Sequence, residues 1–296
     1  MIKQSGIIFS TFVITIFFIA PTFISYVFAQ SNLDKDKIAV TYIANEGFLV
    51  EMQNHKVMFD ALFGGINGNW CEQPSDSINN LMMNGITPFD NIDVIFVTHK
   101  HIDHFDPTLV VNFLMSHPGT KLVCPLQATE MIKENSDYKN IQSKIVSLDC
   151  TPYYDTLLSI NKINIRAMRF NHGSYFETDT TTGELFDRHK NVDNMCYLVE
   201  VGGINVFHTG DCSTSDTTHF HNYNIKKLEI DIALFDKTFF KREGQELINK
   251  YIKSGNIIFM HIEPGRADFY SSIIKDVPQM YILKNSLETK IYRKGT

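Results

Sequence analysis

One short stretch constrains this chain more than any other: Val97–Pro107, which reads VTHKHIDHFDP and follows an apolar, strand-like run. Imidazole and carboxylate groups are common ligands of divalent metals. In an extended segment, side chains two positions apart face the same side, so the first three donors would converge while the last points differently. Four donors in one loop could therefore serve two adjacent ions, with further ligands arriving from elsewhere. The four donors are His99, His101, Asp103 and His104.

Three further donors stand far along the chain, and each follows an apolar run that is typical of a strand. They lie in RFNHGS, VFHTGDCS and IIFMHIEPG, and they are His172, Asp211 and His261. Taken singly, each has an ordinary explanation as a hydrogen-bonded histidine or a turn residue. Seven donors in this order instead predict a metal site. A carboxylate can bridge two metals, which a histidine does poorly, so Asp211 is the candidate for a bridging position.

The pattern of apolar residues predicts an α+β fold. Ile38–Val50 and Asn194–His208 each indicate a β-hairpin. Asp106 followed by Pro107 is typical of the start of a helix. Strands dominate the start of both halves of the chain, and helices lie between them. This arrangement predicts two β-rich halves with helices packed outside.

At these residues the sequence resembles the metallo-β-lactamase superfamily. The likeness extends from about Ile38 to Gly265 and includes the hairpins, Asp60, the HxHxDH motif, the later histidines and the aspartate of TGD. It implies a four-layer αββα sandwich with two metal ions at one edge of the two sheets. By position, the first ion would be bound by His99, His101 and His172 and the second by Asp103, His104 and His261, with Asp211 bridging both.

The resemblance also implies the chemistry, which is hydrolysis. The motif FMHIEPG is most similar to the lactonase and N-acylphosphatidylethanolamine phospholipase D-like branch, although Asn45-Glu46 stands where that branch commonly has a histidine and a small residue. We expect a hydroxide held by two metals to attack an ester, lactone or phosphodiester bond. Asp103 is the expected catalytic residue, which would orient the water and pass its proton to the leaving group. Zn²⁺ is the first expectation for both ions, and Mn²⁺ and Fe²⁺ accept the same ligand types.

Three other functions of the fold stay open beside the hydrolase. A zinc β-lactamase generally lacks an aspartate at the position of Asp211. A sulfur dioxygenase-like oxidoreductase with one iron tends to leave the second set of ligands unused, whereas that set is complete here. A non-catalytic binding module would be expected to have lost a ligand, and none is lost. Hydrolysis is therefore the main prediction.

Substrate contacts are predicted less sharply. Ser174–Asn194 directly follows His172 and is polar with interspersed aromatic residues. This segment predicts either a lid, in which Tyr175 and Arg188 contact the substrate, or an ordinary surface loop. Trp70, the single tryptophan of the chain, is expected to be a buried structural residue, with a place on the rim of the site as the alternative.

The N-terminus has the layout of a secretory signal peptide. A single charge at Lys3 precedes an apolar run, Ile7–Ala20, and small or apolar residues occupy the −3 and −1 positions before a cleavage site at Ala29. We expect export to the periplasm or the extracellular medium, with residues 30–296 forming a single domain. An uncleaved membrane anchor is the alternative.

Charge and cysteine content narrow the possible partners. The formal net charge is −6, which argues against nucleic acid and leaves a small-molecule or lipid substrate. No two cysteines are spaced as CxxC, so a sulfur-type zinc site is not indicated. Their odd number leaves at least one free thiol or an intermolecular bridge. The cysteines are Cys71, Cys124, Cys150, Cys196 and Cys212.

Overall fold

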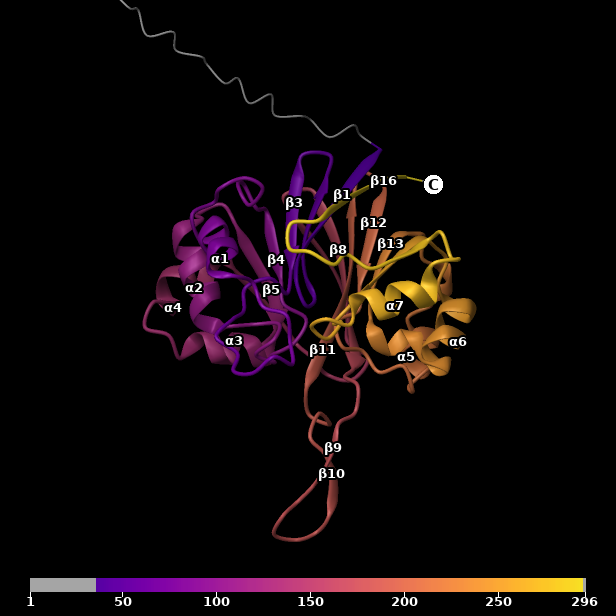
Figure 1. The fold of residues 1–296 in the computed structure, drawn as a ribbon. Helices are drawn as coiled ribbons and strands as arrows, with labels where there is room; N and C mark the ends of the chain where they lie inside the picture. Colours follow the sequence, from indigo (N-terminus) through magenta and orange to yellow (C-terminus); the bar gives the residue numbers. More distant parts are fainter. Residues whose placement is uncertain (1–35, 295–296) are drawn as a thin grey trace, which may run out of the picture. The chain divides into compact units, whose positions relative to one another are not determined.

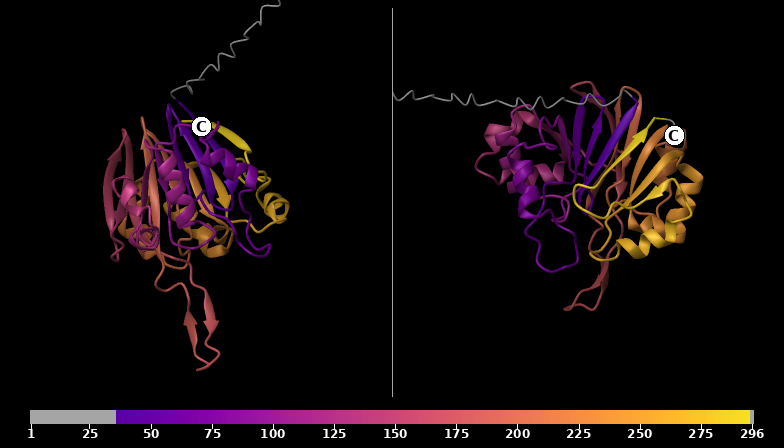
Figure 2. Two further views of the ribbon diagram at one scale, coloured as in Figure 1. Left: turned by 90° about the vertical axis from the view of Figure 1, so that its left-hand side faces the viewer. Right: turned by 45° about the horizontal axis from the view of Figure 1, so that its top comes forward.

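Two seven-stranded β-sheets pack face to face, and helices cover the outer face of each sheet (Figure 1). The structure, a computed structural model, describes residues 36–294. The predicted signal peptide, residues 1–29, lies outside the described residues. Figure 2 shows the same layers from two further sides. The layers confirm the predicted α+β fold and the αββα sandwich.

The first sheet contains six strands from the N-terminal half of the chain and one from the C-terminus. Its strands pair antiparallel from β16 to β3 and parallel from β3 to β6. In order across the sheet they are β16 (Thr289–Arg293), β1 (Lys37–Ala44), β2 (Gly47–Met52), β3 (His55–Phe59), β4 (Val94–Phe96), β5 (Lys121–Pro125) and β6 (Ile145–Leu148).

The second sheet is formed by the C-terminal half. Its strands pair parallel from β15 to β12 and antiparallel from β12 to β7. In order they are β15 (Met280–Tyr281), β14 (Ser254–Met260), β13 (Ile230–Asp236), β12 (Ile204–His208), β11 (Asp193–Val201), β8 (Ile163–Asn171) and β7 (Asp155–Ile160). The two predicted hairpins are thus β1–β2 and β11–β12.

The helices fall into two sets, one on each outer face (Figure 1). The first sheet carries α1 (Asp76–Met83), α2 (Pro107–Ser116), α3 (Leu126–Lys133) and α4 (Tyr138–Ile141), and the second carries α5 (Thr218–Asn222), α6 (Arg242–Tyr251) and α7 (Ala267–Ile274). Short 3₁₀ turns are η1 (Gln142–Lys144), η2 (Ile225–Lys227) and η3 (Lys237–Phe240). Among the described residues, no helix combines the length and the apolar character that a membrane crossing needs.

Apolar side chains fill the spaces between all four layers. Val50 and Tyr197 belong to the cluster between the sheets, Phe113 to the cluster beneath α1–α4, and Phe235 to the cluster beneath α5–α7. All are buried. This burial is the main stabilising term of the fold, and it holds the edge where both sheets end in a fixed geometry.

The start of α2 follows directly from the sequence. The side chain of Asp106 accepts a hydrogen bond from the Leu109 backbone N–H at 2.8 Å, and Pro107 occupies the first helical position. An N-cap carboxylate satisfies a backbone N–H that the helix leaves free, and proline has no N–H to satisfy there. The helix therefore begins immediately after the histidine cluster and fixes where that loop ends.

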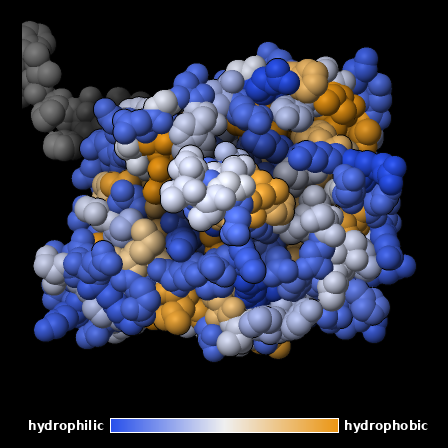
Figure 3. Space-filling model, turned by 90° about the horizontal axis from the view of Figure 1, so that it is seen from below, coloured by the Kyte–Doolittle hydropathy of each residue, from blue (hydrophilic) through white to orange (hydrophobic). Residues whose placement is uncertain are grey.

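Ser174–Asn194, predicted to be a lid or a loop, contains a small hairpin of its own. Its strands are β9 (Phe176–Thr178) and β10 (Leu185–Asp187), and they project away from the sandwich as an arm (Figure 1). Figure 3 views the face that bears the arm, where a hydrophilic surface is interrupted by separate hydrophobic patches. All five cysteines are free thiols, and Cys212 is buried in the core beneath α5–α7.

Candidate metal centre

All seven predicted donors meet at one edge of the sandwich, each just after a strand. The loop after β4 carries four of them, and Asp211 follows β12 by three residues. His172 follows β8, and His261 follows β14. Strands of both sheets end here, which is why residues far apart in sequence come together. We call His99, His101 and His172 the first position, and Asp103, His104 and His261 the second position.

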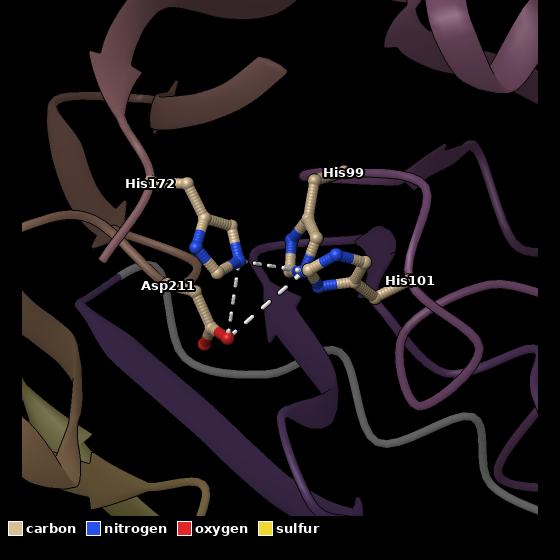
Figure 4. A group of neighbouring side chains, drawn as sticks. All are labelled: His99, His101, His172 and Asp211. Carbon is tan, nitrogen blue, oxygen red and sulfur yellow. Dashed lines mark hydrogen bonds and ion pairs between the residues drawn. The ribbon is translucent and has the colours of Figure 1, made fainter. Parts of the chain in front are cut away.

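The first position brings three imidazole nitrogens together (Figure 4). His99 Nε2 is 3.0 Å from His101 Nδ1 and 3.3 Å from His172 Nε2. Ligand atoms about 2.0–2.1 Å from a tetrahedral Zn²⁺ lie about 3.3 Å apart. The spacing of these nitrogens therefore fits a single ion.

The second position pairs imidazole with carboxylate. His261 Nε2 is 3.1 Å from Asp103 Oδ2, and His104 Nε2 is 3.6 Å from the same oxygen. Asn45 Nδ2 donates to Asp103 Oδ2 at 3.3 Å and to its carbonyl at 3.1 Å, which holds the aspartate in place. One of the three donors of the second position is thus a carboxylate, whereas all three donors of the first position are imidazoles.

Asp211 stands between the two positions. Its Oδ2 is 3.5 Å from His172 Nε2 and 4.0 Å from His99 Nε2, and it is 3.8 Å from His104 Nε2 and 3.7 Å from His261 Nε2. One carboxylate oxygen thus faces nitrogens from both groups. The geometry is what a bridging ligand requires.

A glycine lets Asp211 reach this point. Gly210 has φ of +52°, and a Cβ there would lie 2.5 Å from Asn194 Oδ1 and 2.7 Å from Thr98 Cβ. Asn194 Oδ1 in turn accepts from the Asp211 backbone N–H at 3.1 Å. Only glycine combines the left-handed backbone with this close approach, so the TGD sequence follows from the geometry.

Hydrogen bonds on the far side of the rings leave the central nitrogens free to bind a cation. His104 Nδ1 donates to Asp60 Oδ2 at 2.9 Å, and His172 Nδ1 donates to the Gly173 carbonyl at 2.7 Å. Thr98 Oγ1 donates to Asp60 Oδ2 and lies 3.0 Å from His99 Nδ1, from which it can accept. A neutral imidazole with its Nδ1 protonated presents a lone pair at Nε2. Asp60 therefore supports histidines of both positions.

The donor set fits divalent metals. Ligand atoms of His99, His101, His172 and Asp211 all lie within 4.8 Å of one another, and those of a second group, which includes His104 and His261, do the same. Among the described residues, His104 Nε2 and Asp211 Oδ1 are buried without a hydrogen-bond partner. Buried polar atoms of this kind are costly unless something binds them. A cation at each position would satisfy them.

Burial and neighbouring charges shift the histidine pKa values of the two positions in opposite directions. Burial and the neighbouring histidines hold the pKa of His99 well below its usual range, and they lower the pKa of His101 to about 3. Burial would also lower the pKa of His104, but the carboxylates of Asp103, Asp211 and Asp60 outweigh it and raise the pKa to about 10. Against the same burial, Asp211, Asp103 and Asp236 raise the pKa of His261 to about 8.

Two residues near the centre were not among the metal ligands predicted from the sequence. His189 lies beside the first position, with its ring 4.6 Å from that of His101 and 4.4 Å from that of His172. Glu46 is fully buried and belongs with His104, Asp211 and His261 to the second group of converging ligand atoms. The departure at Asn45-Glu46 from the pattern of the resembled branch was the one signal for Glu46. No local signal distinguished His189.

A pocket of about 880 Å³ opens onto the centre. His101, Asp103, Asp211 and His261 line it, and Tyr175 and Arg188 from the base of the arm line it as well. Arg188 Nη1 also pairs with Glu177 at 3.0 Å. The predicted substrate-contact candidates thus face the same space as the metal ligands.

The expectation that Trp70 is buried was wrong. The sequence favoured a buried structural tryptophan, but its side chain is 48% exposed and lines the pocket with Lys100 and Ile102. It lies in the irregular segment between β3 and α1 but outside the small buried cluster that Phe63, Ile66 and Cys71 of the same segment form with Ala44. The alternative, a place on the rim of the site, is what the structure has.

Comparison with known proteins identifies the family. A model of the β-lactamase superfamily domain matches residues 55–267. The chain is 24% identical over 190 residues to the endoribonuclease ysh1 of Schizosaccharomyces pombe, a match that covers 59% of this chain. It spans only 22% of the length of that relative.

Solved structures share the fold at low identity. A possible metal-dependent hydrolase from Veillonella parvula has a TM-score of 0.58 and 17% identity, covering 85% of this chain and 98% of that one. A metallo hydrolase from the archaeon Ignicoccus hospitalis has a TM-score of 0.56 and 14% identity, covering 87% and 99%. CmlA, a diiron β-hydroxylase from Streptomyces venezuelae, has a TM-score of 0.53 and 10% identity, covering 88% and 54%. The family match over most of the chain, with this fold and this donor set, shows that the chain belongs to the metallo-β-lactamase superfamily and is a metal-dependent hydrolase of that superfamily.

Proposed function

We propose that the protein is an exported hydrolase that uses two divalent ions to cleave an ester, lactone or phosphodiester bond in a small-molecule or lipid substrate. The observation that carries this proposal is the place of Asp211, whose Oδ2 faces nitrogens of both positions. A mononuclear centre would use Asp211 only toward the first position, whereas this oxygen also faces His104 and His261 of the second. When bound, the two ions would supply a water activated at neutral pH and would polarise the scissile carbonyl or phosphoryl group.

Buried charge supports two ions over one. Four acids of the centre are buried. Among the described residues, the ion pairs that these acids form are with histidines. Burying several carboxylates together is unfavourable unless positive charge compensates them. Two divalent ions would provide that charge. The buried acids are Glu46, Asp60, Asp103 and Asp236, with the half-buried Asp211 beside them.

Asp103 has the features required of the proton-handling group. It lines the pocket, and Asn45 fixes its carboxylate from behind. Burial opposes ionisation, but His104 and His261 outweigh it and lower the pKa of Asp103 to about 2. An ionised carboxylate at this place can orient the attacking water by accepting a hydrogen bond from it, and the proposed transfer of the water's proton to the leaving group would pass through this group.

Metal content tests the proposal. Elemental analysis of the purified chain should give two zinc or manganese ions per molecule, and Asp211→Ala should lose at least one. One iron per chain, unchanged in the variant, would overturn the bridge and favour the sulfur dioxygenase-like alternative. Asn205→Ala, a partly buried polar residue on β12 outside the centre, is the matched control and should keep both ions.

Substrate class needs its own test. A panel of a lactone, an aryl ester, a phosphodiester, a β-lactam and a short RNA should be assayed with the metal-loaded chain. The relative from Schizosaccharomyces pombe is an endoribonuclease by name, so RNA is included even though the net charge of −6 opposes its binding. Cleavage of RNA or of the β-lactam alone would overturn the proposed substrate class.

The proposal that the protein is exported is based on the N-terminal sequence pattern, and a separate experiment tests it. Expression of the full chain followed by cell fractionation should place it outside the cytoplasm. Mass spectrometry of the mature protein should show cleavage near Ala29. A full-length chain that stays with the membrane fraction would instead support the anchor.

A further inference from the structure

Glu46 is a buried acid that faces the carboxylate of Asp211, with Asp236 and Asp60 also close enough to interact with it. Its side chain is fully buried, and among the described residues neither carboxylate oxygen has a hydrogen-bond partner. Oε2 lies 3.5 Å from His104 Nδ1, but that nitrogen already donates to Asp60. Burying an acid against other carboxylates is costly unless positive charge compensates them, and a cation bound between Glu46 and Asp211 would supply that charge.

The turn that carries Glu46 is built into the metal centre. His208 Nε2 donates to the Glu46 carbonyl at 3.2 Å, because the other ring nitrogen of His208 accepts from the Gly210 N–H at 3.1 Å. On the other side of the turn, the Asn45 carbonyl accepts from the His261 backbone N–H at 3.2 Å. The turn is thus tied to the segments that carry Asp211 and His261, and Glu46 is held in place before any metal binds.

Glu46 points at the second position. One of its oxygens, a nitrogen of His104, an oxygen of Asp211 and a nitrogen of His261 all lie within 4.8 Å of one another. A proton could satisfy at most two of these groups, because it forms a bond to one atom and a hydrogen bond to another. A metal ion can accept all four as ligands.

We propose that Glu46 supplies a further oxygen ligand to the second position, which therefore discriminates less against Mn²⁺ and Fe²⁺ than the first position does. This inference rests on the proposed dinuclear function. The converging group that contains Glu46 has two imidazoles and two carboxylates, with Asp103 beside it, whereas the group at the first position has three imidazoles and one carboxylate. Carboxylate-rich sites with more than four ligands suit Mn²⁺, while imidazole-rich tetrahedral sites suit Zn²⁺.

Titration of the metal-free full-length chain with Zn²⁺ alone and with Mn²⁺ alone tests the inference. In the wild type, the ratio of Zn²⁺ to Mn²⁺ affinity should be smaller at the second position than at the first. Glu46→Gln keeps the shape of the side chain and removes its charge. It should weaken Mn²⁺ at the second position by more than the roughly 10–100-fold that loss of an outer partner causes, and it should leave Zn²⁺ at the first position unchanged.

Two controls separate a ligand from a structural residue. Glu51→Gln, on β2 of the same hairpin, should leave both metal affinities unchanged. The melting temperature of metal-free Glu46→Gln should equal or exceed that of the wild type, because the variant replaces an acid buried against Asp211 with an amide that can donate a hydrogen bond to it. If Glu46→Gln does not fold, Glu46→Asp keeps the charge on a shorter side chain, and it should weaken Mn²⁺ at the second position while leaving Zn²⁺ at the first position unchanged.

The outcomes distinguish this inference from the function on which it rests. A wild-type chain that binds one ion overturns the dinuclear function itself. Two ions in the wild type, with equal Zn²⁺ to Mn²⁺ ratios at both positions or with a loss below about 100-fold in Glu46→Gln, overturn the role of Glu46 and leave the dinuclear function standing.

Discussion

The two halves of the metal centre use the same imidazole rings in opposite electrostatic settings. At the first position, burial among other histidines keeps His99 and His101 neutral, so their nitrogens are ready to bind metal at neutral pH. At the second position, carboxylates raise the pKa values of His104 and His261 to about 10 and about 8. A metal must displace protons there. The motif HxHxDH thus contributes ligands to one position whose imidazoles are already neutral and to one whose charges are compensated by protons until metal binds.

Removing the residue shared by both halves should have the largest effect. Asp211→Ala is expected to lower kcat/KM on the order of 10³-fold, since it withdraws charge from both ions and metal activation supplies several kcal/mol. Steady-state kinetics with excess metal in the buffer would check this. Activity within tenfold of the wild type would show that the two positions do not depend on a shared ligand.

Asp103→Asn should come next and should affect one half alone. Loss of the proton-handling carboxylate is expected to lower kcat by about 10²–10⁴-fold, while the metal content of the first position stays constant. Kinetics paired with elemental analysis would separate these effects. Loss of both ions would instead mean that Asp103 holds the centre together.

Asp60→Asn should weaken both halves to a similar extent, because Asp60 contacts His104 directly and His99 through Thr98. Metal affinity is expected to fall about 10–100-fold at each position, as is typical for partners behind the ligands. Calorimetric titration measures both affinities. An effect confined to the second position would show that Thr98 does not transmit the contact to His99.

Metal affinity should depend on pH differently at the two positions. His104 and His261 have raised pKa values in the metal-free fold, so their protonation stabilises that fold at low pH, and this contribution is lost as pH rises through about 8 and about 10. Metal affinity at the second position should therefore rise between pH 6 and 8 while that at the first position stays nearly constant. Titrations at several pH values would check the slopes, and equal slopes would contradict the comparison.

The smallest effect is expected from the pocket wall on the side of the first position. Arg188→Ala should raise KM for an anionic substrate by up to about fivefold, since an exposed charge pair contributes at most about 1 kcal/mol. Tyr175→Ala is expected to act similarly through lost contact. Lys237 lines the same pocket, and Lys237→Ala is expected to raise KM for an anionic substrate by a similar factor.

The structure of the arm could not be predicted from the sequence. Its polar composition left a lid and a loop equally open, because two short strands with exposed Phe176 and Leu185 bury no face against the sandwich. Without burial there is no periodic pattern to read. Trp70 was misjudged for a related reason: apolar character predicts burial only when neighbours exist to cover the side chain.

The sequence by itself determined the fold class, the hairpins, the start of α2 and the seven converging donors, because those features depend on local periodicity and on motifs with fixed spacing. Only the tertiary structure decided that Asp60 supports both positions, that His189 adjoins the first and that Glu46 completes a second cluster. These contacts join segments far apart in sequence, as between His208 and Glu46, which are 162 residues apart. Their geometry follows from how the two sheets pack, which no local pattern encodes.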